Sequence, residues 1–297
     1  YDDITLDRNQ FFYDLDGDGK QTCEPILAGR YLCEAIGKRT SSILGVSLIY
    51  DRLDNRVRPT RGLMASVSAD YAGLGGSVKY ARITANASKY FPLGHGFIFS
   101  LRGEGGAIKA LGSRSNDPTI DDIRLTDRFF LGEPQIRGFD IRGVGPRVLR
   151  KLYSGQDDYG VGGTPSTDRN QWVDDALGGK YYYLAHAEVE IPLGSGAREM
   201  GLRPSIFVDA GAVFGVTHPQ VSGTGTILYV DNITQKVTTF SQDSSGTKNR
   251  AYQKYDEVFV GDSPKPRISV GIGVNWNSPF GPFRIDFAKV LSKVQGD

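Results

Sequence analysis

Polar and apolar side chains alternate along most of the chain after residue 40, in runs of about ten residues. One run places Leu44, Val46 and Leu48 on one face of an extended strand, and Gly45 and Ser47 on the other. The runs lie at 42–51, 62–73, 80–90, 97–108, 181–191, 203–214 and 267–276, and around Phe283, Ile285 and Phe287. A period of two residues is typical of β-strands whose two faces meet different surroundings. The pattern predicts an all-β protein with about eight antiparallel strands in up-and-down order.

The connections between these strands are of two kinds. Short turns that contain proline lie at 54–61, 91–96, 192–202 and 277–282. The connections between them are mostly long, at 1–40, 112–179 and 216–265, with a brief link at 73–78 as the exception. Tilted strands of about ten residues cross a bilayer, and outer-membrane barrels alternate short periplasmic turns with long surface loops. The unequal connections therefore favour a membrane barrel over a soluble barrel or sandwich, which would explain the alternation equally well.

Aromatic residues mark the ends of the predicted strands, as in the interfacial girdles of membrane barrels. They are Tyr50, Tyr71, Tyr90, Phe91, Tyr181 and Trp276. We expect a transmembrane antiparallel up-and-down β-barrel whose parts divide the chain in four. These are a surface loop at 1–40, four strands at 41–111, a long loop folded into the lumen at 112–179, and four strands with a surface loop (216–265) at 180–297.

Composition narrows the function classes. The 297 residues include 35 basic and 34 acidic side chains, so the net charge of +1 gives no electrostatic reason to expect nucleic acid as a partner. The sequence contains no run of about 18 apolar residues, so it predicts no transmembrane helix. The negative mean hydropathy agrees with a barrel, because only alternate residues of each strand face lipid. The start Tyr-Asp-Asp carries no signal peptide, and we interpret the sequence as an internal fragment or the ordered part of a longer protein.

The segment before the first strand contains both cysteines, Cys23 and Cys33. In an oxidising compartment they would close a short loop, worth about 3 kcal/mol against the unfolded chain. Two unpaired thiols are the alternative. Asp14, Asp16 and Asp18 alternate before a glycine like the start of a calcium loop, but Pro25 occupies the twelfth position, where a bidentate Glu is required. A divalent cation and a solvated acidic turn both stay open, and we expect no other cofactor.

The central stretch 128–147 falls in no strand or helix pattern. Its apolar bulk comes from Phe129, Phe130 and Phe139. Its backbone freedom comes from Gly132, Gly138, Gly143 and Gly145, and its positive charge from Arg128, Arg137, Arg142 and Arg147. A loop that is merely solvated does not require three phenylalanines, so we expect this one to fold back and pack inside the barrel.

A loop tucked into a lumen needs a charged anchor. Arg137 precedes Gly138 and Phe139, where the chain can bend sharply, and guanidinium offers a planar fork for a carboxylate. The alternation places Asp209 on the inward face, which makes it the expected partner. Further inward-facing carboxylates are Glu188, Glu190 and Asp286. The alternative is that Arg137 is a solvated loop charge.

Residues for catalysis are sparse. His95, His186 and His218 are scattered without zinc-ligand spacing, and no nucleophile elbow or Ser/His/Asp set is indicated. Glu188 and Glu190 share one strand face, which a hydrated barrel wall explains more simply than a carboxylate pair. The sequence does not predict an enzyme.

The chain after residue 40 resembles the C-terminal half of the barrel of BamA-type outer-membrane protein assembly factors, in the bacterial surface antigen superfamily. The motifs that carry the resemblance are Tyr50-Asp-Arg-Leu-Asp-Asn55, Pro59-Thr-Arg-Gly62, Ala72-Gly-Leu-Gly-Gly76, Arg128-Phe-Phe-Leu-Gly132, Ile136-Arg-Gly-Phe139, Phe207-Val-Asp-Ala-Gly211 and Ser278-Pro-Phe-Gly-Pro282. Each motif alone is weak, and the set together is specific.

The resemblance implies a barrel of about sixteen strands in the outer membrane of a Gram-negative bacterium, preceded by periplasmic POTRA domains. It implies an insertase that folds other outer-membrane proteins without nucleotide energy, through a lateral seam between its first and last strands. Unfolded outer-membrane proteins, accessory lipoproteins, periplasmic chaperones and the lipid bilayer are the implied partners. It also implies that Arg137 reaches into the lumen toward acidic groups, with Asp209 the expected one.

The sequence departs from the family pattern in two respects. About half the strands are present, and we expect the POTRA domains, the first strands and the closing strand to lie outside it; the loop at 1–40 with its cysteines also has no counterpart. An alternative function is a translocation or secretion pore of the same superfamily, either TamA-like or of the two-partner type. A third is a structural eight-stranded barrel closed on itself, whose lumen would be too narrow for the long central loop.

Overall fold

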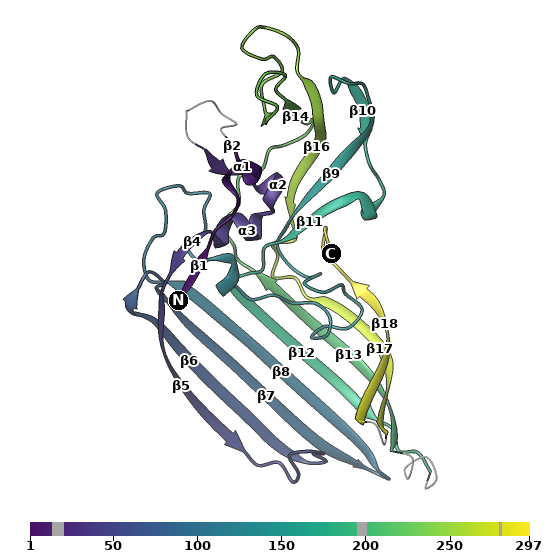
Figure 1. Cartoon of the computed structure of the whole chain (residues 1–297). Coiled ribbons are helices and arrows are strands. Elements are labelled where there is room, and N and C mark those ends of the chain that lie inside the picture. The colour runs from purple at the N-terminus through teal and green to yellow at the C-terminus, as the bar shows by residue number, and fades with distance from the viewer. Residues whose placement is uncertain (14–20, 195–200, 279–280) are drawn as a thin grey trace.

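The computed structural model describes residues 1–13, 21–194, 201–278 and 281–297. Its main element is an eight-stranded antiparallel sheet with the order β18-β17-β13-β12-β8-β7-β6-β5 (Figure 1). The strands are β5 (Ser41–Asp51), β6 (Gly62–Gly76), β7 (Tyr80–Gly94), β8 (Phe97–Ala110), β12 (Tyr181–Glu190), β13 (Leu202–Phe214), β17 (Arg267–Ser278) and β18 (Gly281–Ser292). These are the eight strands that the sequence predicts, so the all-β barrel class is confirmed, and within this chain the sheet is open between β5 and β18.

The alternation of side chains gives the sheet two chemically different faces. His186 of β12 lies opposite Arg102 of β8 and Asp209 of β13, so these polar side chains share the inner face. On the outer face the apolar side chains are exposed; Leu48 is 73% exposed and Phe287 70%. Such a surface suits lipid, because apolar side chains gain by leaving water.

A second sheet stands beyond one end of the first (Figure 1). Its strands are β9 (Arg147–Gln156), β10 (Gly162–Pro165), β11 (Trp172–Ala176), β14 (Thr226–Val230), β15 (Val237–Thr238) and β16 (Arg250–Val260). They come from the two segments predicted as the long loops at 112–179 and 216–265. The two segments meet because β9 pairs with β16, with Tyr255 opposite Leu152. Only the first part of the central segment therefore packs on the inner wall of the large sheet.

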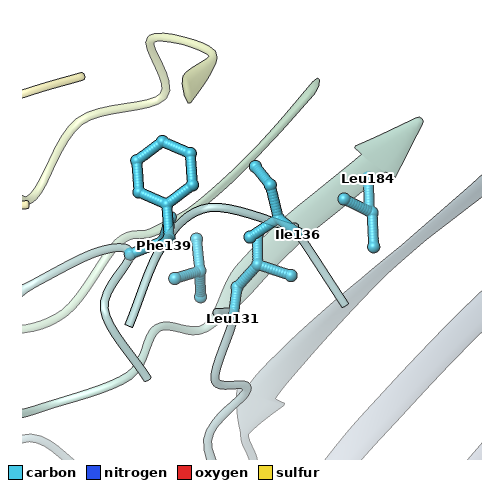
Figure 2. Packing of buried hydrophobic residues seen from close by; sticks show 6 residues of the cluster. Leu131, Ile136, Phe139 and Leu184 are labelled. Carbon is cyan, nitrogen blue, oxygen red and sulfur yellow. The ribbon is translucent and has the colours of Figure 1, made fainter. Parts of the chain in front are cut away.

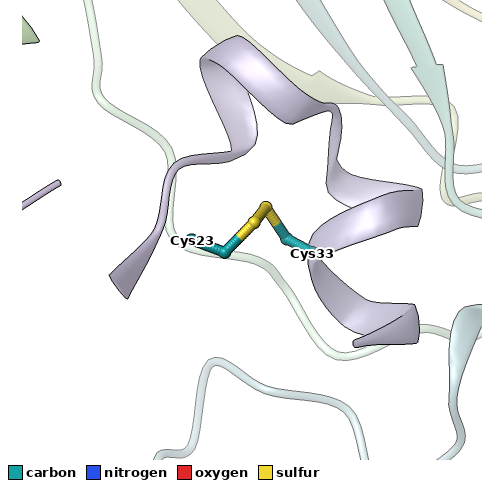
Figure 3. The surroundings of a disulfide bond; sticks show 2 residues. All are labelled: Cys23 and Cys33. Carbon is teal, nitrogen blue, oxygen red and sulfur yellow. A yellow bond between two sulfur atoms is a disulfide. The ribbon is translucent and has the colours of Figure 1, made fainter. Parts of the chain in front are cut away.

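The segment before β5 contains short elements in place of an irregular loop. They are β1 (Asp2–Ile4), α1 (Arg8–Phe11), β2 (Phe12–Tyr13), β3 (Thr22–Cys23), α2 (Pro25–Ala28), α3 (Arg30–Ala35) and β4 (Gly37–Arg39). The predicted disulfide is confirmed, since Cys23 and Cys33 are joined with an S–S distance of 2.09 Å (Figure 3). The proposed calcium ligands Asp14, Asp16 and Asp18 lie outside the described residues. In the part of the chain that is described, no helix is long and apolar enough to cross a membrane.

One of three buried apolar clusters in the described chain lies between the central loop and the inner wall. Beyond the short 3-10 helix η1 (Leu125–Asp127), the loop packs Leu131, Ile136 and Phe139 against Leu184 of β12 (Figure 2). All four side chains are nearly inaccessible to solvent. The loop therefore covers an apolar part of a wall that is otherwise polar, which is why it does not project into water.

Candidate functional site

The central loop turns sharply where it delivers Arg137 to the wall. The N–H of Ile136 donates to the carbonyl of Gly132 at 3.0 Å, and Gly138 has a φ of +87°. A Cβ on Gly138 would lie 3.1 Å from the Cβ of Ala288 on β18. Glycine is needed here both for the left-handed backbone and for the close approach of the loop to the strand.

The guanidinium of Arg137 forms a two-pronged contact with Asp209 on β13. Its Nε lies 2.7 Å from Oδ2 of Asp209 and one terminal nitrogen 2.6 Å from Oδ1, while the backbone N–H of Arg137 also donates to Oδ2 at 3.2 Å. The guanidinium carbon sits 3.3 Å from the ring centroid of Phe207. The two-pronged contact with Asp209, the backbone hydrogen bond and the packing on the Phe207 ring together fix the orientation of the Arg137 side chain. Lysine lacks the planar fork and could not be held in the same way.

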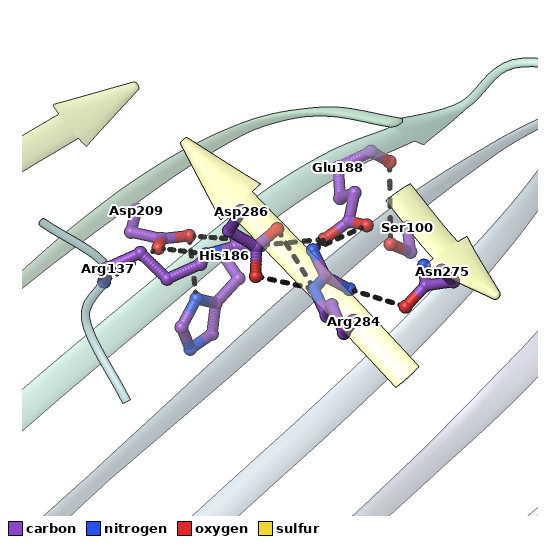
Figure 4. Close-up of polar contacts among 8 residues, drawn as sticks. All are labelled: Ser100, Arg137, His186, Glu188, Asp209, Asn275, Arg284 and Asp286. Atoms are coloured by element: carbon purple, nitrogen blue, oxygen red, sulfur yellow. Dashed lines mark hydrogen bonds and ion pairs between the residues drawn. The ribbon is translucent and has the colours of Figure 1, made fainter. Parts of the chain in front are cut away.

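Two further strands, β12 and β18, contribute charged and polar neighbours to this pair (Figure 4). Glu188 of β12 lies 3.3 Å from a terminal nitrogen of Arg137, and Asp286 of β18 lies 3.6 Å from the same nitrogen. Arg284 then joins these two carboxylates, at 3.0 Å from Glu188 and 2.7 Å from Asp286. Nδ1 of His186 lies 2.9 Å from Oδ1 of Asp209. We call these six residues the lumen cluster.

The structure brings together four of the five charged residues predicted for the anchor. Glu190 does not join them, because it lies further along β12, where among the described residues it pairs with Arg203 at 3.7 Å. Sequence reasoning did not assign Arg284 or His186 to the cluster. Both residues are on inward-facing positions of predicted strands, so the alternation placed them on the correct face without indicating which row they share.

The opposite charges around Asp209 explain why this carboxylate can be buried. Two arginines face three carboxylates, and the side chain of Asp209 is fully inaccessible. Burial lowers the pKa of Arg137, but the hydrogen bond and charge of Asp209 outweigh burial and raise it, so the guanidinium stays protonated. A buried carboxylate without such a partner would cost several kcal/mol. The arrangement ties the loop to the wall by charged contacts, and among the described residues no group of three or more His, Cys, Asp or Glu side chains is placed to hold a metal ion.

Comparison with known proteins places this geometry in a family. The family model of the Omp85 superfamily domain matches residues 2–297. The chain belongs to the Omp85 superfamily. Among curated Omp85 relatives, the outer membrane protein assembly factor BamA of Neorickettsia risticii is 28% identical over 286 residues, which is 96% of this chain and 28% of that protein. BamA of Neisseria meningitidis is 27% identical over 83% of this chain and 26% of its own length.

A SAM50-like protein of Drosophila melanogaster is 33% identical over a shorter stretch, which is 38% of this chain and 24% of that protein. Among solved structures, BamA from Haemophilus ducreyi lacking POTRA domains 1–3 matches 86% of this chain and 40% of its own, with a TM-score of 0.56 and 23% identity. The chain thus spans about a quarter of the length of the curated relatives. It is a BamA-type Omp85 chain that covers the C-terminal barrel region, in the outer membrane of a Gram-negative bacterium.

Proposed function

We propose that this chain forms the C-terminal half of the barrel of an outer-membrane protein assembly factor, which folds and inserts other β-barrel proteins. The observation that carries the proposal is the lumen anchor: Arg137 holds the central loop against the inner wall through Asp209. A loop held in this way keeps the barrel interior structured, while the outer face of the same strands meets lipid.

The assembly reaction needs no nucleotide in this proposal. Unfolded outer-membrane proteins would enter through a lateral seam between the first and last strands of the complete barrel. An unpaired strand edge is a template for another strand, so each incoming strand gains backbone hydrogen bonds as it pairs. Accessory lipoproteins and periplasmic chaperones would deliver these clients, and the bilayer would receive them.

Within that reaction the lumen cluster is a positioning device. It connects the loop to β12, β13 and β18 by charged contacts, so the wall and the loop move as one body. We infer that this rigidity confines opening to the seam, because distortion of the wall elsewhere would break contacts that are costly to lose in a buried site.

The test uses the full-length protein reconstituted in phosphatidylcholine vesicles, with a urea-denatured outer-membrane barrel as client and no nucleotide. Folding of the client is followed by its altered mobility in unheated gels. The wild-type protein should accelerate folding over empty vesicles, and Arg137→Ala should lose most of that acceleration. Arg137→Lys, which keeps the charge but not the fork, should retain an intermediate rate.

Arg250→Ala is the matched control, because it removes an arginine from an ion pair with Asp158 that is exposed on both sides. It should assemble clients as the wild type does. If the wild-type protein does not accelerate insertion, the insertase proposal is wrong. If the client instead appears inside the vesicles, protected from protease and not inserted, the chain belongs to a translocation pore.

A further inference from the structure

The outer face of the large sheet is hollowed near the end that faces the second sheet. A cavity of about 570 Å³ lies over β5 to β8 and the start of β12. Small side chains form part of its lining, namely Ala69, Ala81 and Ala107. Larger side chains, among them Val46 and Tyr181, line it too. This groove opens toward the membrane, since most of its lining residues lie on the apolar outer face.

Two lysines lie on the same outer face at the end of the groove. Lys109 of β8 is opposite Ala81, and the carbonyl of Lys79 accepts the N–H of Leu111 one row further along. The stem of Lys79 runs past Gly73, where an added Cβ would lie 3.7 Å from Lys79 Cγ and 3.7 Å from the ring of Tyr71. Both lysines are exposed, and neither has an ion-pair partner among the described residues. By contrast, Lys180 is paired with Asp121 at 3.0 Å.

Positive charge continues beyond Lys79. This residue also lines a hollow of about 400 Å³, together with Arg114 and Arg124. The guanidinium of Arg124 has no hydrogen-bond or ion-pair partner in the described chain. Burial and the charges of Arg114 and Arg39 lower the pKa of Arg124 by more than the charges of Asp127 and Glu34 raise it, so an anion there would relieve repulsion between cations.

The carboxylates that border this hollow are already engaged. Asp122 accepts hydrogen bonds from the hydroxyl of Ser113 at 3.0 Å and from the backbone N–H of Arg114 at 2.9 Å. Asp127 lies 3.6 Å from a terminal nitrogen of Arg39. Among the described residues, neither carboxylate forms an ion pair with Lys79, Lys109 or Arg124, so these three cations can pair with a ligand at this edge.

We propose that this edge binds one anionic, phosphate-bearing lipid of the outer leaflet. Its acyl chain lies in the groove over Ala81 and Ala107, and its phosphate lies between Lys79 and Lys109, within reach of further polar headgroup atoms toward Arg124. Lysine suits this place because its apolar stem can follow the sheet while the ammonium reaches the headgroup layer. The inference requires the barrel to sit in the membrane and does not depend on assembly activity.

The test is native mass spectrometry of the full-length protein in detergent, titrated with phosphatidic acid or with phosphatidylcholine carrying identical acyl chains. Two lysines near a phosphate predict about thirtyfold tighter binding of phosphatidic acid. Inorganic phosphate and glycerol phosphate, added in excess, should not displace the lipid. Displacement by either would show that the site binds the phosphate group alone and would overturn the lipid proposal.

The double variant Lys79→Gln/Lys109→Gln should reduce the preference for phosphatidic acid to near that of phosphatidylcholine. Ala107→Leu, which fills the groove and leaves both lysines, should weaken both lipids equally. Lys89→Gln is the control, because Lys89 is on the same face at the other end of β7, beside the ring of Phe91. The proposal fails if the double variant keeps the preference, or if Lys89→Gln reduces it as much.

Discussion

Two of the buried clusters of arginine and carboxylate in the described chain differ in their surroundings and in the arrangement of their charges. In the lumen cluster, Arg137 reaches three carboxylates on three strands and lies against an aromatic ring. The second cluster, which we call the cap cluster, has two arginines on one carboxylate. Glu257 of β16 lies 3.0 Å from Arg30 of the N-terminal segment and 3.3 Å from Arg150 of β9, and it accepts the N–H of Ser222 at 2.9 Å.

The difference teaches how the two clusters would fail. In the lumen cluster Arg137 contacts three carboxylates, so the loss of one leaves the other two. The exception is Asp209, which accepts both hydrogen bonds of the guanidinium fork. In the cap cluster both arginine ion pairs are made to the single carboxylate of Glu257. Its members lie outside the membrane-spanning strands. Loss of Asp209 should therefore reduce the stability of the protein most, and protonation of Glu257 should weaken only the contacts of the cap cluster.

The largest effect is expected for Asp209→Ala. It leaves Arg137 buried without its main partner, and breaking a buried pair on one side costs about 3–5 kcal/mol. The folded barrel should convert to its unfolded form at a clearly lower temperature in gel-mobility assays, and trypsin should cut within 128–147. Unchanged conversion in both Asp209→Ala and Asp209→Asn would mean that the loop is held by its apolar contacts.

An intermediate effect is expected for Glu257→Gln, because hydrogen bonds to charged groups are worth about 1.5–3 kcal/mol. Burial raises the pKa of Glu257, but the charge of Arg30, the N–H of Ser222 and the charge of Arg150 lower it more, so the folded pKa lies below the ordinary value. The resulting stability is present above the unfolded pKa of about 4.3 and is lost as pH falls through the folded pKa.

Hydrogen exchange of residues 25–35, corrected for intrinsic rates, measures this effect at pH 7 and near pH 3. The wild-type protein should lose protection at the lower pH, whereas Glu257→Gln should be less protected at pH 7 and change little on acidification. Equal acid sensitivity of the two proteins would assign the effect to another group.

The smallest effect is expected for Arg250→Ala. The side chains of Arg250 and Asp158 are 72% and 71% exposed, and exposed ion pairs contribute about 0–1 kcal/mol. Neither the conversion temperature nor protease sensitivity should change measurably. A loss comparable with that of Asp209→Ala would break the distinction between buried and exposed pairs on which the comparison rests.

The eight strands of the large sheet could be predicted because each has one lipid-facing and one inward face. The second sheet could not, and β9 illustrates the reason. Four consecutive residues, Arg147 to Arg150, are buried, so both faces of that strand are covered and the period of two disappears. Two of the four are arginines, which composition alone assigns to the surface.

The site was predictable to the extent that it follows from alternation and charge. Arg137 and Asp209 could be paired because one was a loop arginine on a flexible turn and the other an inward carboxylate. Glu190 fulfils the same criteria, yet it lies too far along β12, because alternation fixes the face and not the row. Whether Arg284 reaches Glu188 depends on the register with which β18 pairs in the sheet. Strand register is set by contacts between distant parts of the chain, so alternation alone could not predict it.

The close approach of Gly138 to Ala288 has a consequence for the order of events during folding. The loop is synthesised well before β18, yet the strand that Gly138 approaches, and two of the loop's charged neighbours, Arg284 and Asp286, come only with β18. Contacts between distant parts of a chain form late, because closing the intervening segment costs entropy. The loop thus reaches its final position on the inner wall only when β18 has completed this half of the barrel.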